Sequence, residues 1–152
     1  YPLSNFKNVV FAGSVVRKDY DWNRVLESGQ VNKVLNFVAS SDWIVGFFPN
    51  SIQKLNWQDL GSAGHDGFDY DENPNIHQIK YISGAHGAAL QEDNWDTISD
   101  FVLTGEITPV PQSIMQKNQS FIVKYLAMIS PVVFFLLAAS SYLQLFLQIR
   151  KL

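Results

Sequence analysis

Short apolar runs alternate with amphipathic segments over the first two-thirds of the chain. Residues 8–13 (NVVFAG) have the apolar, β-branched character of a buried strand, and residues 33–38 (KVLNFV) and 78–82 (QIKYI) are predicted to form two further strands. Residues 21–27 carry an acid at an N-cap position and apolar residues at helical spacing. A last helix is predicted from residue 93 or 94 to Gly105, because a glycine commonly ends a helix. Strands separated by helices or long crossovers predict an α/β fold with a parallel sheet.

The last of these helices has a periodic apolar pattern. Trp95, Ile98, Phe101 and Val102 recur at helical spacing, so we expect them to form the stripe that packs on the sheet.

A long uncharged run closes the chain. Residues 125–149 contain no charged side chain, and basic residues at Lys124, Arg150 and Lys151 flank them. A helix of about 20 apolar residues crosses a bilayer, so the pattern predicts a transmembrane helix. The chain would then be a membrane protein, single-pass or multi-pass, with the lipid bilayer as a partner and the side of its other part undetermined. The alternative is a buried helix in a larger soluble core.

The distribution of charge predicts a boundary between two environments. Residues 1–106 contain all fourteen acidic and seven basic residues, a net charge of −7, whereas residues 107–152 contain four basic residues and no acid. Between these two parts of the chain, prolines at positions 109 and 111 stiffen the backbone. We therefore expect an α/β domain over residues 1–107, a linker over 108–120 and a transmembrane helix with its flanks over 121–152.

Composition excludes several functional classes. The chain has no cysteine, which removes disulfide scaffolds, zinc fingers, iron–sulfur clusters and thiol nucleophiles. Its net charge of −3 argues against nucleic acid as a partner, because phosphate binding needs a basic face. The acidic stretch 69–73 departs from a calcium loop, since Pro74 and Lys80 stand where that loop needs glycine and glutamate. We expect no metal and no other cofactor.

The candidate chemistry lies where strands end, because functional groups collect at the carboxyl ends of parallel strands. Asp42 follows the second predicted strand and His86 follows the third. Asp42 could instead only cap the helix that starts at Trp43, and His86 could be a loop histidine that binds backbone. Asp19 and Asp21, after the first strand, are the alternative acids.

We expect two other histidines, His65 and His77, to lie on loops, and we give them little weight as functional residues.

The order strand, Ser-x-Asp, insertion, strand, Gly-x-His and helix resembles the C-terminal half of an α/β-hydrolase fold. The resemblance covers roughly residues 7–106, with Asp42 in NFVASSDWIV and His86 in YISGAHGAAL. In that family the triad acid follows the penultimate strand and the histidine follows the last one. The fold class implied is therefore α/β, with a partial parallel sheet formed by the last three hydrolase strands, followed by the transmembrane α-helix.

The nucleophile that this family needs is missing. No G-x-S-x-G occurs in the chain. Ser14 follows a strand, but Val16 stands where the motif needs glycine, and Ser62 has no strand before it. We therefore expect a fragment whose nucleophile and oxyanion hole lie upstream of residue 1.

The resemblance implies a membrane-anchored serine hydrolase, similar to esterases and lipases, whose substrate is a small ester or acyl compound. The alternative is a non-catalytic, membrane-tethered interaction module on the same fold. If the hydrolase interpretation holds, an Asp42 oxygen should lie about 2.6–3.2 Å from Nδ1 of His86. Gly84 and Gly87 should let the histidine loop turn sharply.

Overall fold

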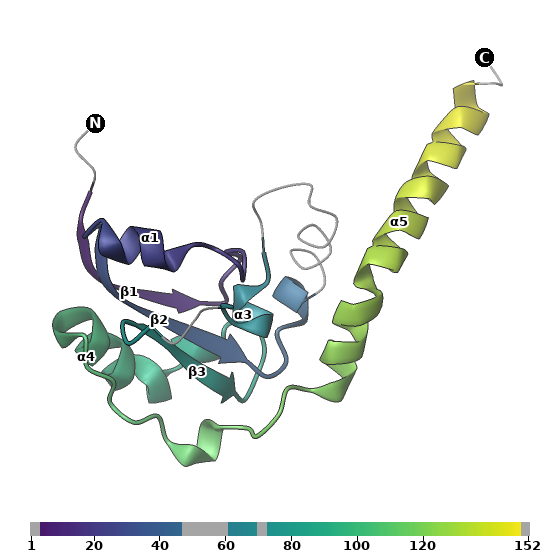
Figure 1. The fold of residues 1–152 in the computed structure, drawn as a ribbon. Coiled ribbons are helices and arrows are strands. Elements are labelled where there is room, and N and C mark those ends of the chain that lie inside the picture. The colour runs from purple at the N-terminus through teal and green to yellow at the C-terminus, as the bar shows by residue number, and fades with distance from the viewer. Residues whose placement is uncertain (1–3, 47–60, 70–72, 150–152) are drawn as a thin grey trace.

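The computed structural model describes residues 4–46, 61–69 and 73–149. Within them, three parallel strands form one sheet in the order β1 (Phe6–Ala12), β2 (Val31–Ala39), β3 (Ile76–Ile82) (Figure 1). The helices α1 (Trp22–Glu27) and α3 (Ala63–Asp66) cover one face, and α4 (Trp95–Thr104) covers the other. The predicted α/β fold with a parallel sheet is confirmed. Its equivalence to the last three strands of a hydrolase stays a prediction.

From Val34 onward the central strand β2 is buried on both faces, in agreement with its mostly apolar sequence there. Leu35 and Phe37 point to one face, where they belong to the same apolar cluster as Phe101 of α4. Val34 points to the other face, where it clusters with Trp22 and Phe68. Strand β2 therefore forms the rigid centre from which the loops after β2 and β3 emerge.

The beginning of α1 and the end of α4 lie at the predicted capping residues. The predicted apolar stripe of α4, in contrast, is wrong in part. Asp21 Oδ1 accepts a hydrogen bond from the Arg24 amide, and α4 ends at Gly105, whose φ of 78° is left-handed. Phe101 is fully buried in the core. Trp95 and Val102, however, are 58% and 44% exposed, so they lie largely outside the packed side of the helix.

The segment predicted as a linker packs along the outer edge of β3. It contains a short 3₁₀ helix, η3 (Gln112–Ile114). The Ser83 amide donates to the Ile114 carbonyl at 2.7 Å, and the Gln116 amide donates to the Tyr81 carbonyl at 2.8 Å. These antiparallel contacts supply β3 with hydrogen-bond partners on the side that faces away from β2.

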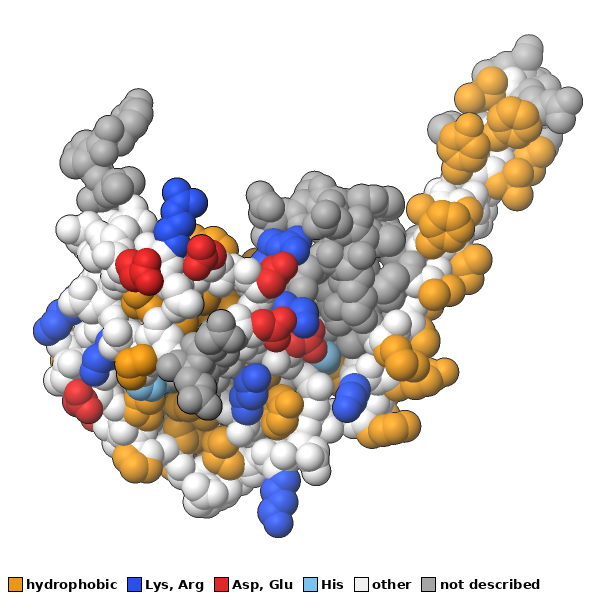
Figure 2. Space-filling model, viewed as in Figure 1, with side chains coloured by type: hydrophobic (Ala, Val, Ile, Leu, Met, Phe, Trp, Pro, Cys, Tyr) orange, Lys and Arg blue, Asp and Glu red, His pale blue; other side chains and the backbone are white. Residues whose placement is uncertain are grey.

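The prediction of a transmembrane helix over residues 121–152 is wrong. Residues Phe121–Ile149 do form one helix, α5, which leads away from the sheet with apolar side chains along its surface (Figures 1 and 2). In the part of the chain that the structure describes, however, no helix combines the length and apolarity that a membrane crossing needs. The prediction relied on the absence of charge, but the run also contains polar side chains at Ser140, Ser141, Gln144 and Gln148.

His77 lies in β3 and not in a loop, so its predicted position is wrong: the strand begins two residues earlier than the sequence pattern indicated. Its ring packs edge-on against Phe101, with 5.8 Å between the ring centroids. Among the described residues, its buried Nε2 has no hydrogen-bond partner. Burial, helped by the nearby positive charge of Lys33, lowers the pKa of His77 below its ordinary value of 6.5.

This lowered pKa predicts that acid destabilises the fold through His77. Below pH 6.5 an unfolded histidine takes up a proton more readily than the folded one, so protons favour the unfolded chain. We expect the free energy of unfolding, measured with urea, to fall as the pH decreases from 7 through this window. In His77→Gln the fall should be smaller. Comparison at pH 8, where histidine is neutral, corrects for changed packing. Equal pH slopes in the two proteins would contradict the prediction.

Candidate active site

Hydrogen bonds join the loop after β2 to the loop after β3. The Ser40 amide donates to the Ile82 carbonyl at 2.7 Å, and the Ser41 amide donates to the Gly84 carbonyl at 2.9 Å. The Gly84 amide donates in return to Oγ of Ser40 at 3.3 Å. The sheet therefore delivers both loops to one edge, and these bonds fix their relative position.

Asp42 is fully buried in the first of these loops and uses both of its carboxylate oxygens. Oδ2 lies 3.0 Å from Nδ1 of His86, and Oδ1 accepts a hydrogen bond from the Val45 amide at 3.0 Å. The predicted contact, including the ring nitrogen that makes it, is confirmed. Asp42 also caps the helical turn that begins at Trp43, so the capping interpretation is confirmed, whereas its role as a catalytic acid stays a prediction.

His86 is the accessible member of the pair. Its side chain is 42% exposed, whereas that of Asp42 is 0% exposed. An ionised carboxylate can only accept, so a neutral His86 that binds ionised Asp42 carries its proton on Nδ1 and has Nε2 as an acceptor. A buried carboxylate that orients an accessible imidazole is the arrangement that an acid–base catalyst requires. The catalytic role itself stays a prediction.

The two alternative acids are engaged elsewhere. Asp19 forms a salt bridge of 2.8 Å with Arg17, and this hydrogen bond lowers the pKa of the Asp19 carboxyl. Asp21 caps α1 through the Arg24 amide. The carboxylate on His86 therefore belongs to Asp42.

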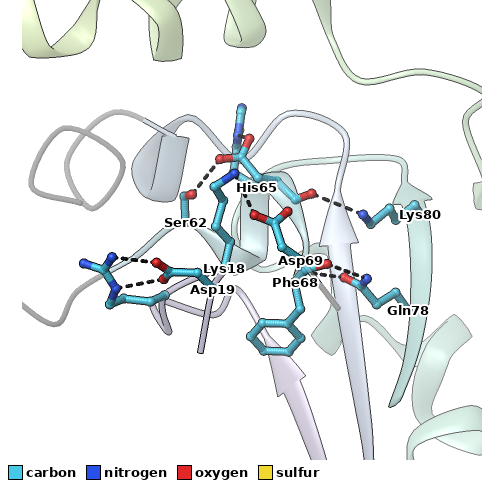
Figure 3. Close-up of polar contacts among 10 residues, drawn as sticks. Lys18, Asp19, Ser62, His65, Phe68, Asp69, Gln78 and Lys80 are labelled. Atoms are coloured by element: carbon cyan, nitrogen blue, oxygen red, sulfur yellow. Dashed lines mark hydrogen bonds and ion pairs between the residues drawn. The ribbon is translucent and has the colours of Figure 1, made fainter. Parts of the chain in front are cut away.

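A second group of serine, aspartate and histidine lies in and beside α3 (Figure 3). Ser62 Oγ donates to Oδ2 of Asp66 at 2.6 Å, and Nδ1 of His65 lies 2.7 Å from Oδ1 of the same carboxylate. Ser62 and His65 therefore both bind the Asp66 carboxylate, whereas in a triad the serine hydroxyl is hydrogen-bonded to the histidine. His65 is in a helix and only 2% exposed, so its predicted loop position is wrong.

Neither candidate serine shows the geometry of a nucleophile. Ser62 is completely buried and donates to Asp66. Ser14 is 6% exposed, and its Oγ accepts a hydrogen bond from the Val16 amide within a local turn. These contacts stabilise the turn and the helix in which the two serines lie.

Further polar contacts hold the turn that follows α3 against the sheet (Figure 3). Lys18 forms a salt bridge of 2.8 Å with Asp69, and Lys80 donates to the Asp66 carbonyl. Burial lowers the pKa of Lys80. Burial also acts to raise the pKa of Asp66, but hydrogen bonds from His65 and Ser62 outweigh it, and the pKa of this carboxyl lies below its usual value. We call this cluster the brace: it consists of Lys18, Ser62, His65, Asp66, Asp69 and Lys80. Most of its charged side chains are paired with each other.

A surface cavity of about 720 Å³ lies beside this brace, and its lining includes Asp19, Trp22, Phe68 and Lys80. Neither Asp42 nor His86 lines it. We therefore do not assign the cavity to the chemistry of the pair.

Among residues 4–46, 61–69 and 73–149, no three His, Asp or Glu side chains are grouped so that they could hold a metal ion. Part of the acidic stretch at 69–73 lies outside the described residues. Comparison of the chain with protein-family models, curated proteins and solved structures found no match.

Glycines contribute to the site in a way that the sequence indicated only in part. Gly84 has a left-handed φ of 128°, as the sharp turn requires. Gly87 has a φ of −89° and no atom within 4 Å of an added Cβ, so its predicted importance is wrong. Gly13 was missed. Its position directly after a strand, before Ser14, was the signal that could have pointed to it.

Proposed function

We propose that Asp42 and His86 are the acid and the base of a serine hydrolase that acts on esters or related acyl compounds. One observation carries the proposal: a fully buried carboxylate lies 3.0 Å from Nδ1 of a partly exposed histidine. The two residues follow neighbouring parallel strands, where chemistry in α/β sheets is concentrated. The order of acid before histidine along the chain agrees with the hydrolase resemblance.

In this proposal Nε2 of His86 takes the proton from a serine hydroxyl and later returns it to the leaving group. Asp42 holds the Nδ1–H and stabilises the imidazolium that forms. The Val45 amide fixes the carboxylate through its other oxygen, so that it cannot rotate away. The serine comes from polypeptide outside these 152 residues, because no G-x-S-x-G occurs within them.

The 152-residue chain alone is therefore expected to show no esterase activity. Without its nucleophile, a triad loses on the order of 10⁶-fold in turnover. The measurement is hydrolysis of p-nitrophenyl butyrate by the purified chain, with the His86→Ala chain as its matched control. Both chains should hydrolyse the ester no faster than buffer alone. Turnover by the first that is absent in the second would contradict this expectation and would favour Ser14 or Ser62 as the nucleophile.

The decisive experiment uses the polypeptide encoded by the complete reading frame in which these residues occur. A fluorophosphonate probe reacts with activated serines, so we expect mass spectrometry to find one labelled serine outside these 152 residues. Labelling should be lost in the His86→Ala protein. If no serine is labelled and esters are not hydrolysed, the proposal fails, and a role of this fold in binding is favoured instead.

A further inference from the structure

Gly13 lies in contact with the ring of His86. It follows β1 directly and has a φ of 62°, in the left-handed region that favours glycine. A Cβ added to Gly13 would lie 2.6 Å from Cε1 and 2.8 Å from Nδ1 of His86. It would also lie 3.0 Å from the His86 carbonyl oxygen. Carbon atoms in van der Waals contact lie about 3.5–4.0 Å apart, so the ring could not keep its place beside a methyl group.

The backbone at Gly13 and Ser14 is also held by α3, which contacts it through Gly64. The Gly64 amide donates to the Ser14 carbonyl at 2.8 Å. A Cβ added to Gly64 would lie 2.5 Å from the Ser14 backbone nitrogen and 2.8 Å from the Gly13 carbonyl carbon. This stretch of backbone therefore contacts both the histidine ring, through Gly13, and α3, so that its freedom to shift is small.

We infer that Gly13 is a positioning residue for His86. Its bare Cα forms the surface against which the Cε1–Nδ1 edge of the ring rests, and this keeps Nδ1 on Asp42. The site thus draws on all three strands: β2 leads to the acid, β3 to the histidine and β1 to the glycine that seats it. The catalytic meaning of the inference rests on the proposed function, whereas its geometric content does not.

The chain offers a matched control for the test. Gly29 has a φ of 70°, close to that of Gly13, but nothing lies within 4 Å of a Cβ added there. Gly29→Ala therefore introduces the same backbone strain without the contact, and the comparison of Gly13→Ala with Gly29→Ala isolates the effect on the ring.

The readout is the position of the ring proton of His86 in the ¹⁵N NMR spectrum of the chain, recorded at pH 8. In the unaltered chain and in Gly29→Ala we expect the proton on Nδ1, because Asp42 accepts it. In Gly13→Ala we expect this state to be lost and the proton to shift to Nε2. An unchanged Nδ1–H tautomer in a folded Gly13→Ala chain would overturn the inference.

A double-mutant cycle covers the case in which Gly13→Ala does not fold. With His86→Ala in the background the ring is absent and only the contact of 3.0 Å with the backbone oxygen of residue 86 remains, so Gly13→Ala should shift the urea midpoint much less than it does when the ring is present. A Gly13→Ala chain that folds only in this background supports the inference. A Gly13→Ala chain that folds in neither background overturns it, because the obstacle is then not the ring.

These outcomes are distinct from those that test the hydrolase proposal. If no activated serine is found, the tautomer and the cycle still report whether Gly13 seats His86. If the serine is found but the tautomer does not respond to Gly13→Ala, only the positioning role fails.

Discussion

His86→Ala is expected to lower ester turnover by about 10⁶-fold in the protein that supplies the serine, and Asp42→Asn by about 10⁴-fold. The first substitution removes the base. The second retains an oxygen that can accept from the Val45 amide but presents a neutral amide to Nδ1 of His86, which no longer fixes the required tautomer. The measurement is kcat on a p-nitrophenyl ester with each variant, after circular dichroism has shown that the variant is folded.

Asp19→Asn is the control for this prediction. It removes a carboxylate of the same type that also follows a strand, but that carboxylate is bound to Arg17 and not to His86. We expect its kcat to equal that of the unaltered protein. If Asp19→Asn abolished turnover while Asp42→Asn did not, the acid would have been assigned to the wrong strand.

Phe101→Ala is expected to lower the free energy of unfolding by about 3–5 kcal/mol. Phe101 is fully buried between α4 and the sheet, where it shares a cluster with Leu35 and Phe37. Its removal leaves a cavity beneath the central strand and takes away the aromatic partner of His77. Small domains have only about 5–15 kcal/mol of stability in total, so the loss is a large part of it. Urea unfolding of the chain measures the change.

The matched control is Leu103→Ala, two residues further along the same helix. Leu103 is 69% exposed, so its truncation should change the free energy of unfolding by about 0.5 kcal/mol or less. Equal losses for the two variants would mean that α4 does not pack on the sheet through Phe101.

The sequence was sufficient to predict the sheet because its strands are short apolar runs bounded by clear signals. Strand β2 is apolar from Val34 onward, apart from Asn36, and this pattern is typical of a strand covered on both faces. Asp21 and Gly105 marked helix ends for reasons of local capping. Such features depend on neighbours in sequence, so no tertiary information was needed to find them.

The Asp42–His86 contact was predictable because a parallel sheet brings consecutive strand ends to one edge. The contact of Gly13 with the His86 ring and the brace around α3 could not be predicted in this way, since they depend on contacts between residues far apart in the chain. Gly64, for example, contacts residues 13 and 14 across about fifty positions of sequence. Helix α3 itself has only four residues, too few to show a periodic pattern.

The prediction for α5 failed for a different reason. The prediction gave the absence of charge between residues 125 and 149 more weight than the amide groups that Gln144 and Gln148 place in the same run. An uncharged side chain can still be strongly polar, and the cost of placing an amide in hydrocarbon is several kcal/mol (about 4–8 by transfer from water).

The antiparallel contacts of residues 114–116 with β3 also bear on how this chain can associate. An uncovered strand edge is a template for another chain, and native proteins commonly cover such edges. Here two backbone hydrogen bonds already occupy the edge of β3. The Ser83 amide donates to the Ile114 carbonyl, and the Gln116 amide donates to the Tyr81 carbonyl. Strand exchange or fibril-type stacking through β3 would first have to displace this segment. Among the described strands, β1 is therefore left as the edge at which a further strand can join the sheet.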